Sequence, residues 1–431
     1  MKVLVLGAGV IGVSSAWYLS QAGHEVTVLD RQAGAGLETS FANGSQISVS
    51  HAEPWANPHA PWQVLSWMGR EDAPLLLRWR WDTALFDWSL RFLRECLPGR
   101  TRQNMRNIVA LALYSRQKLQ TLRAATGIAY DQLTRGILHI YTDQREWDAA
   151  LQASALMREF GCARRAVSAD ECVQIEPALA AARSRLVGGD YTESDESGDA
   201  HRFTQNLAAL CALRGVRFRY GCTVERLHFS DNKISAVQIS SQPSVTPGSE
   251  AALAQAKTPS DDLLTADLYV LALGSYTPRL LHPLGIHLPI YPAKGYSATL
   301  ALSEHSVAPS VSLTDDGHKI VFSRLGQRLR IAGTAEFNGY DLSLNPVRCQ
   351  ALIARAHSLF PQLKPLSEPE FWCGLRPATP SNVPIIGRTR YPNLYLNSGH
   401  GTLGWTLACG SAAALADLID GRTPEPEFCF L

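Results

Sequence analysis

Short apolar runs alternate with longer amphipathic stretches along much of the chain, which is typical of a protein that combines strands with helices. The clearest case lies at the start. An apolar, β-branched run over 3–6 stops at Gly7, a helix-compatible stretch follows, and a second apolar run over 26–29 ends at Asp30. This order predicts a strand, a helix and a second strand that form one βαβ half.

The same periodicities predict the other elements. Amphipathic spacing predicts helices over 104–126, around 145–160, over 203–214 and from Trp405 onward, and apolar runs predict strands over 136–141, 216–220, 233–239, 268–273 and 394–396. Residues 241–262 are rich in Pro, Ser, Thr and Ala and have no period. They are predicted to form an expanded, flexible hairpin tip and not a domain linker.

Composition narrows the class of protein. The protein has 431 residues, 46% of them hydrophobic, and its 40 basic and 39 acidic residues give a net charge of +1. This length suits two or three folding units, and the balanced charge argues against a nucleic-acid partner. The nine cysteines form no C-x-x-C pair, so we expect reduced thiols in a cytoplasmic protein without a metal site. No uninterrupted apolar stretch reaches the length of a membrane-spanning helix, and the N-terminal run is expected to belong to the fold.

Glycines follow the first predicted strand at the G-x-G-x-x-G spacing. Gly7 permits a tight turn, Gly9 allows the backbone to approach a pyrophosphate, and Gly12 allows the helix to pack closely on the strand. Asp30 lies where an acid accepts hydrogen bonds from ribose hydroxyls. The motif predicts a dinucleotide site but does not separate NAD from FAD. The predicted contacts are Gly7, Ala8, Gly9, Val10, Ile11, Gly12, Asp30 and Arg31.

A second glycine-rich helix start lies near the C-terminus. The strand at 394–396 runs into a glycine-rich loop, and a helix begins at Trp405. NAD needs no second loop of this kind, whereas a flavin ring, which gains negative charge on reduction, suits a helix N-terminus. Gly274, at the end of the strand over 268–273, also allows a close approach. The predicted contacts in the loop are Gly399, His400, Gly401, Thr402, Leu403, Gly404, Trp405 and Thr406.

Two further segments carry candidate chemistry. Arg376 lies in a segment braced by Gly and Pro, where its planar guanidinium suits a substrate carboxylate; a structural ion pair is the alternative. Residues 54–95 hold six of the ten tryptophans, with arginines between them. They are either core aromatics with solvated arginines or an amphipathic surface that docks on a bilayer.

Several motifs occur together and in order: GAGVIGVSSAWYLSQAGHEVTVLDR from Gly7, ETSFANGSQIS from Glu38, YPAKGYS from Tyr291, GLRPATP from Gly374 and GHGTLGWT from Gly399. Nearly end to end, the protein resembles the D-amino-acid oxidase/glycine oxidase class of FAD-dependent oxidoreductases. The resemblance implies FAD, held non-covalently because Cys373 and Cys409 lie in no covalent-flavin motif. It also implies cofactor contacts at Ser40, Asn43, Gly44, Gln46 and Val224.

The resemblance further implies oxidative deamination of D-amino acids to 2-oxo acids and ammonia, by hydride transfer from Cα to flavin N5. Arg376 falls on the arginine that binds the substrate carboxylate. A tyrosine that often assists in relatives is missing, and His318, Lys319 and Tyr296 are the candidates to replace it. Oxidation of glycine, sarcosine or D-proline-like secondary amines is an alternative, and a non-catalytic flavin electron-relay subunit is a second one.

The resulting expectation is an α/β protein, α+β overall. A discontinuous Rossmann-like FAD-binding domain over 1–85, 165–280 and 374–431 carries an inserted substrate domain over 86–164 and 281–373, built on a mixed or antiparallel sheet. The expected electron acceptor is a quinone or another carrier that is not O2. The expected location is the cytoplasm, with peripheral attachment to the inner face of the cell membrane through 54–95 as a hypothesis.

Overall fold

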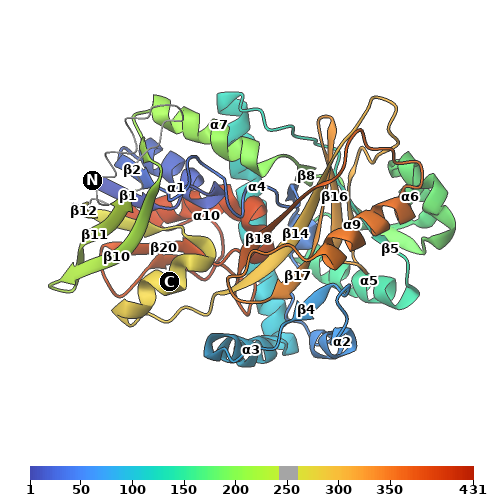
Figure 1. The fold of residues 1–431 in the computed structure, drawn as a ribbon, viewed down its shortest axis with the longest axis horizontal. Helices are drawn as coiled ribbons and strands as arrows, with labels where there is room; N and C mark the ends of the chain where they lie inside the picture. Colours follow the sequence, from blue (N-terminus) through green and yellow to red (C-terminus); the bar gives the residue numbers. More distant parts are fainter. Residues whose placement is uncertain (242–260) are drawn as a thin grey trace, which may run out of the picture.

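The computed structural model describes residues 1–241 and 261–431, and most of the predicted hairpin tip at 241–262 lies outside these ranges. Two large sheets lie along the long axis of the molecule. Figure 1 shows β1, β2 and β20 toward one end of this axis and β5, α5 and α6 toward the other. The long helix α4 (Pro98–Thr126) lies in the middle of the molecule and crosses the long axis.

The first sheet is parallel except at one edge. Its order is β19 (Ile385–Arg388), β20 (Leu394–Ser398), β13 (Leu268–Leu271), β1 (Lys2–Leu6), β2 (Glu25–Leu29) and β9 (Arg217–Arg219). Only the β19–β20 pair is antiparallel among these described strands. The predicted first βαβ half is therefore confirmed, with α1 (Val10–Gln21) as its helix.

Alternation along β1 explains how this sheet is covered. Val3 and Val5 pack on one face into a core with α1, α4, α7 (Ala200–Leu213) and α10 (Gly404–Ile419). Leu4 and Leu6 point to the other face, because successive side chains of a strand alternate. There they meet a small antiparallel sheet of β10 (Cys222–Ser230), β11 (Lys233–Ser241) and β12 (Asp261–Leu264), together with α8 (Thr277–Leu281).

The second sheet is mixed. Its order is β18 (Glu370–Ala378), β14 (Tyr291–Ala301), β17 (Arg328–Phe337), β16 (Ile320–Leu325), β15 (Ser312–Asp315), β5 (Ile137–Tyr141), β7 (Gly188–Thr192) and β6 (Arg165–Ser168), with β4 (Leu75–Leu77) paired to β17. Antiparallel pairing dominates, and α9 (Pro346–Leu359) packs against β14 and β17. The predicted fold class, a parallel nucleotide-binding sheet beside a mixed sheet, is confirmed.

The domain boundaries predicted from the sequence do not coincide with the division of the strands between the two sheets. β4, β6 and β7 all join the mixed sheet, although the predicted boundaries place their residues in the FAD-binding domain. Pairing partners that lie far apart in the sequence carry no local signal, because strand pairing is decided by tertiary contacts. The exact boundaries stay a prediction.

The remaining elements border the mixed sheet or the long helix. They are the β3–β8 pair (Gln46–Ile47 with Glu196–Ser197), α2 (Ala60–Trp67), α3 (Thr83–Glu95), α5 (Gln144–Glu159) and α6 (Ala169–Ile175). The predicted helices correspond to α4, α5, α7 and α10. Helix α4 begins earlier than predicted, at Pro98, a residue favoured in the first turn of a helix.

Gly401–Ile419 is the one stretch of the described residues that forms a helix long and apolar enough to cross a membrane. Its apolarity has a structural reason, since 72% of the window is buried inside the protein. Helix α10 packs against both α1 and α4. Its composition is therefore that of a central core helix.

Candidate active site

A large cavity of about 1350 Å³ is lined by the glycine-rich loops of the parallel sheet and by one part of the mixed sheet. Pockets for small ligands usually measure ~300–1,000 Å³. The cavity is therefore large enough for a dinucleotide and a second small molecule together.

The turn after β1 is built by close packing around its glycines. Gly7 has a φ of +106°, and a Cβ at Gly12 would lie 1.8 Å from the Gly7 carbonyl oxygen. The Asp30 carboxylate accepts hydrogen bonds from the backbone N–H groups of Ala8 (2.6 Å) and Gln32 (2.8 Å). Burial raises the pKa of Asp30. Asp30 thus braces the turn as well as lining the cavity.

Helices α1 and α10, which start at this cavity, differ at their N-termini from most other helices of the protein. Helices α3, α5, α6, α7 and α9 are each capped by an Asp, Ser or Asn side chain. Within the described residues, neither α1 nor α10 has a capping side chain at its N-cap residue or an acidic residue in the first turn, although Ser40 Oγ accepts from the Val10 N–H of α1 at 3.0 Å. Unsatisfied N–H groups and the positive end of the helix dipole attract anions. The cavity therefore suits a pyrophosphate at one helix and an anionic ring system at the other.

Most cofactor residues predicted from the sequence line this cavity. They are Gly7, Gly9, Val10, Ile11, Asp30, Arg31, Ser40, Asn43, Gly44, Gln46, Val224, Gly274, His400, Gly401, Thr402, Leu403, Gly404, Trp405 and Thr406. Ala8, Gly12 and Gly399 are not among the lining residues. Gly12 lies behind the turn, and a Cβ at Gly399 would lie 2.8 Å from Thr379 Cγ2. Ala8, Gly12 and Gly399 therefore support the loops that form the walls of the cavity. The predicted contacts themselves remain predictions.

Arg376 is a partly buried cation that lines the cavity without a carboxylate partner among the described residues. Its Nη1 donates to the Thr334 carbonyl at 2.7 Å, and no carboxylate of the described residues forms an ion pair with it. Burial, with Arg348 nearby, lowers the pKa of Arg376 to about 10, so the guanidinium is charged at neutral pH. A buried charge is costly unless it is paired. Arg376 is therefore suited to an anionic ligand.

The backbone around Arg376 is shaped to hold it. The guanidinium lies against Gly295, where a Cβ would be 2.2 Å from Arg376 Cζ. Thr334 has a φ of +55°, which is unusual for a β-branched residue, and this conformation directs its carbonyl to Arg376. Such strain persists where the surrounding structure enforces it, often at functional sites.

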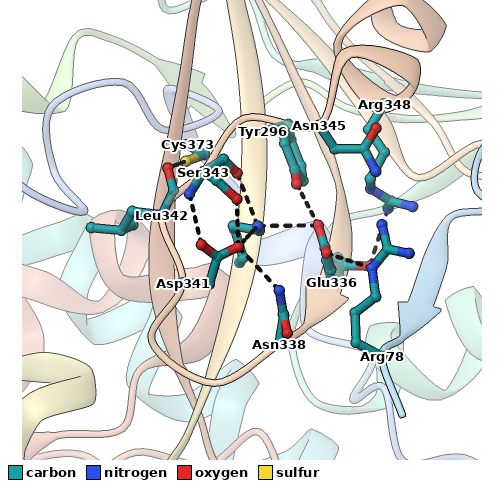
Figure 2. A network of polar contacts seen from close by, with 12 residues as sticks. Arg78, Tyr296, Glu336, Asn338, Asp341, Leu342, Ser343, Asn345, Arg348 and Cys373 are labelled. Atoms are coloured by element: carbon teal, nitrogen blue, oxygen red, sulfur yellow. Dashed lines mark hydrogen bonds and ion pairs between the residues drawn. The ribbon is translucent and has the colours of Figure 1, made fainter. Parts of the chain in front are cut away.

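Tyr296 lies at the edge of the cavity, but its hydroxyl takes part in a separate polar network. Figure 2 shows Tyr296 and Arg78 both directed at the Glu336 carboxylate. Lys294 Nζ lies 3.3 Å from Glu336 and donates to Asp341 at 2.8 Å. Because its hydroxyl is already engaged, Tyr296 is poorly placed for the substrate role predicted from the sequence.

Of the two candidates predicted at the hairpin between β15 and β16, only Lys319 lines the cavity. His318 is half-exposed, contacts Asp315 (3.3 Å) and is not a lining residue. Its neighbour Lys319 does line the cavity, with a left-handed backbone (φ +53°). Adjacent residues point in different directions at this turn, which sequence alone cannot determine. The position of His318 gives its predicted role no support.

A polar cluster that sequence reasoning missed surrounds Lys319. Asp316 accepts from His139 Nδ1 at 2.6 Å and lies 3.4 Å from Lys319 Nζ. His51, His139 and Asp316 each offer one nitrogen or oxygen atom within 4.8 Å of the others. All four residues line the cavity, but His51, His139 and the turn that holds both Asp316 and Lys319 are three separate segments with no shared motif. Burial alone would raise the pKa of Asp316, but His139, Lys319 and Arg164 together lower it, and the two basic side chains disfavour a metal cation.

This cluster forms the polar end of a region that we call the distal arm. The distal arm is the part of the cavity lined by α2, α5 and the turn Asp316–Lys319. Figure 1 shows α2 and α5 on the side of the molecule away from β1 and β2. The cavity therefore extends from the dinucleotide turn to a second region beside α2 and α5.

His400 is a buried residue of the C-terminal loop, where burial lowers its pKa to about 3. Its Nε2 pairs with Ser411 Oγ at 3.1 Å. An unfolded histidine titrates near ~6.5, so as pH falls below that value the unfolded state binds the proton first and stability falls. We expect His400→Gln to remove about 2 kcal/mol of the loss in unfolding free energy between pH 7 and pH 5. Urea unfolding at both pH values measures this; identical pH dependence in variant and wild type would contradict it.

Comparisons with known proteins agree with this geometry. The family model described as FAD dependent oxidoreductase (DAO) matches residues 2–418. A protein of Dechloromonas aromatica (strain RCB) named D-amino acid dehydrogenase is 64% identical over 431 residues, covering 100% of both proteins. One of the same name from Paramagnetospirillum magneticum is 52% identical, covering 98% of this protein and 96% of the relative.

Solved structures show the same fold at low sequence identity. Glycine oxidase from Bacillus cereus superposes with a TM-score of 0.70 at 21% identity, over 99% of this protein and 98% of its own length. L-proline dehydrogenase from P. horikoshii superposes with a TM-score of 0.74 at 17% identity, over 98% and 94%. These likenesses concern the fold alone.

Proposed function

The chain belongs to the FAD dependent oxidoreductase family, and from this premise we propose that it is a D-amino acid dehydrogenase. It oxidises D-amino acids to 2-oxo acids and ammonia. The observation that carries the proposal is the Arg376 guanidinium, which is partly buried at the cavity, is held by Thr334 and Gly295, and has no carboxylate partner among the described residues. The two relatives described above, named for this activity, support the choice of substrate. The finer identity that the motifs suggest, the small subunit of the bacterial enzyme, belongs to the same proposal.

The residues of the protein bind and orient the substrate, while FAD, when bound, accepts a hydride from the substrate Cα. Arg376 binds the carboxylate through a planar pair of donors. The uncapped N-terminus of α10 favours negative charge on the ring system. Non-covalent attachment is supported because Cys373 and Cys409 do not line the cavity, and the Cys373 thiol donates to the Leu342 carbonyl.

An anaerobic titration tests the proposed reaction. We expect D-alanine to bleach the oxidised flavin spectrum of the purified holoenzyme, and L-alanine to leave it unchanged. Bleaching by glycine or sarcosine but not by D-alanine would favour the alternative substrates. If no amino acid reduces the flavin, the protein is an electron-relay subunit and the proposal fails.

We further propose that the electrons pass to a quinone and that the protein docks on a membrane. The apolar face defined by the large exposed side chains between 62 and 97 supports this. Its members are Trp62, Leu65, Met68, Leu77, Trp79, Trp81, Phe86, Leu90, Leu93 and Leu97. Trp79 and Trp81 are 95% and 106% exposed, a costly arrangement in water.

Helix α3 accounts for both interpretations of the tryptophan-rich segment. One side of the helix is core: Trp88 is buried and its Nε1 donates to the Ala378 carbonyl at 2.8 Å. On the other side, Phe86, Leu90 and Leu93 form an exposed apolar stripe at helical spacing. The exposed Arg94 accompanies the stripe and suits an anionic lipid surface, whereas the exposed Arg91 pairs with Asp87 at 2.9 Å. Attachment to the inner face of the cell membrane, with the rest of the protein in the cytoplasm, is the location that we propose.

Replacing Trp79 and Trp81 with serine is expected to weaken partition onto anionic phospholipid vesicles by roughly 100-fold, because each ring loses about 1.5 kcal/mol or more of apolar burial. Sedimentation of the purified holoenzyme with vesicles measures the effect. The double variant Leu213→Ser and Phe229→Ser, which removes exposed apolar groups elsewhere, serves as the control. Equal loss of partition in both double variants would contradict docking through the apolar face.

A further inference from the structure

Thr334 and Gly295, which hold Arg376, lie outside the distal arm. We propose that the distal arm binds the electron acceptor, a quinone drawn from the lipid bilayer. This inference rests on the proposed function, because only an enzyme that oxidises a first substrate needs a site for a second substrate that accepts the electrons.

The distal arm connects the apolar face with the site around Arg376. Trp62 is 74% exposed and belongs to the apolar face, yet it also lines the cavity. Arg376 and the glycine-rich loops line the same cavity, so the arm and the flavin site are parts of one continuous space. A lipophilic molecule that leaves a membrane docked at the apolar face therefore enters the arm directly.

The walls of the arm match the two parts of a quinone. Val64 and Trp67 on α2 and Ala153 and Leu156 on α5 line the same cavity, and they offer apolar contact for a flat ring and its hydrocarbon tail. At the polar end, Lys319 and His51 can donate hydrogen bonds to the ring oxygens. A pocket that is mostly apolar with a few convergent polar groups is the usual form of a small-molecule site.

The polar cluster also supplies a route for protons. Loss of two electrons converts the zwitterion RCH(NH3⁺)COO⁻ to the iminium RC(=NH2⁺)COO⁻ and releases two protons. Reduction of a quinone to a quinol consumes two electrons and two protons. The two half-reactions therefore balance without another oxidant or acid. Water then converts the iminium to the 2-oxo acid and ammonium. His51 lies beside the His139–Asp316 pair, where protons would pass to the quinone oxygens.

Separate measurement of the two half-reactions tests the site. In Ala153→Trp the indole fills the arm, whereas Ala155→Trp adds the same group to an exposed position of α5 outside the cavity. With decylubiquinone as the probe, we expect Ala153→Trp to slow reoxidation of the reduced holoenzyme at least about tenfold, while reduction by D-alanine changes less than about twofold. Ala155→Trp should match the wild type in both.

A second variant and a labelling experiment test the site in ways that do not depend on how well Ala153→Trp folds or on steady-state turnover. His51→Gln should slow reoxidation by decylubiquinone about tenfold but not by ferricenium, which takes electrons without protons. A photoactivatable azidoquinone should label peptides of α2 or α5 in the wild-type holoenzyme, and excess decylubiquinone should suppress the label.

The outcomes separate this inference from the proposed function. If D-alanine fails to reduce the wild-type holoenzyme, the proposed function fails. If reduction is normal but quinone reoxidation is equal in Ala153→Trp and wild type, or the label maps elsewhere, the inference is wrong. If Ala153→Trp impairs reduction by bulky D-amino acids such as D-phenylalanine instead of reoxidation, the arm holds substrate side groups and the inference is again wrong.

Discussion

We expect Arg376→Ala to lower kcat/KM for D-alanine by roughly 30- to 4,000-fold, because truncating one partner of a buried charge pair costs about 2–5 kcal/mol. The guanidinium has no carboxylate partner among the described residues, and the Thr334 carbonyl accepts its hydrogen bond. Without it, the carboxylate of the substrate loses both its counter-charge and its orientation. Steady-state kinetics under saturating acceptor measure the loss, and flavin content should remain that of the wild type.

Two further variants separate charge from geometry. Arg376→Lys keeps the charge but loses the planar pair of donors, so it should recover only part of the activity. Gly295→Ala retains the arginine at position 376, but the new Cβ would lie 2.2 Å from Arg376 Cζ and must displace the guanidinium. We therefore expect a loss in Gly295→Ala that approaches that of Arg376→Ala.

Arg324→Ala provides the control for a change in net charge, since Arg324 does not line the cavity and its Nε donates to the Gly326 carbonyl. An unchanged kcat/KM in Arg376→Ala, or an equal loss in Arg324→Ala, would refute the role of Arg376. Either result would also remove the main support for an amino acid substrate.

The second large effect is expected at Gly12, where alanine should leave the purified protein largely without FAD. A Cβ at this position would lie 1.8 Å from the Gly7 carbonyl oxygen and 2.9 Å from its carbonyl carbon. Both contacts are with backbone, so the turn between β1 and α1 must open. Forced overpacking costs about 1–3 kcal/mol or more, and here it falls on the turn that approaches the pyrophosphate.

The absorbance ratio of flavin to protein after gel filtration measures this loss, and the thermal unfolding midpoint should fall with it. Gly99→Ala is the matched control. Gly99 lies in α4, and a Cβ there would meet nothing within 4 Å among the described residues. Full flavin occupancy in Gly12→Ala would show that the turn tolerates a Cβ and that its close packing is not required.

Local patterns in the sequence determined a large part of this protein. The βαβ start and the loop before α10 were recognisable because glycine spacing and apolar periodicity act over a few residues. Arg376 was identifiable for the same reason, since Gly and Pro neighbours mark a constrained segment. The sequence also supported both interpretations of the tryptophan-rich segment, but it could not assign Trp88 to the core and Trp79 to the surface.

Tertiary structure alone decided which distant segments meet. His51, His139 and Lys319 have no common motif, and they converge because β5, the turn before β16 and the loop after β3 lie side by side at one cavity. The choice of Lys319 over His318 depends on a single backbone conformation at a turn. Local sequence specifies elements and their faces, whereas strand pairing and packing, which join residues hundreds of positions apart, decide which faces share a site.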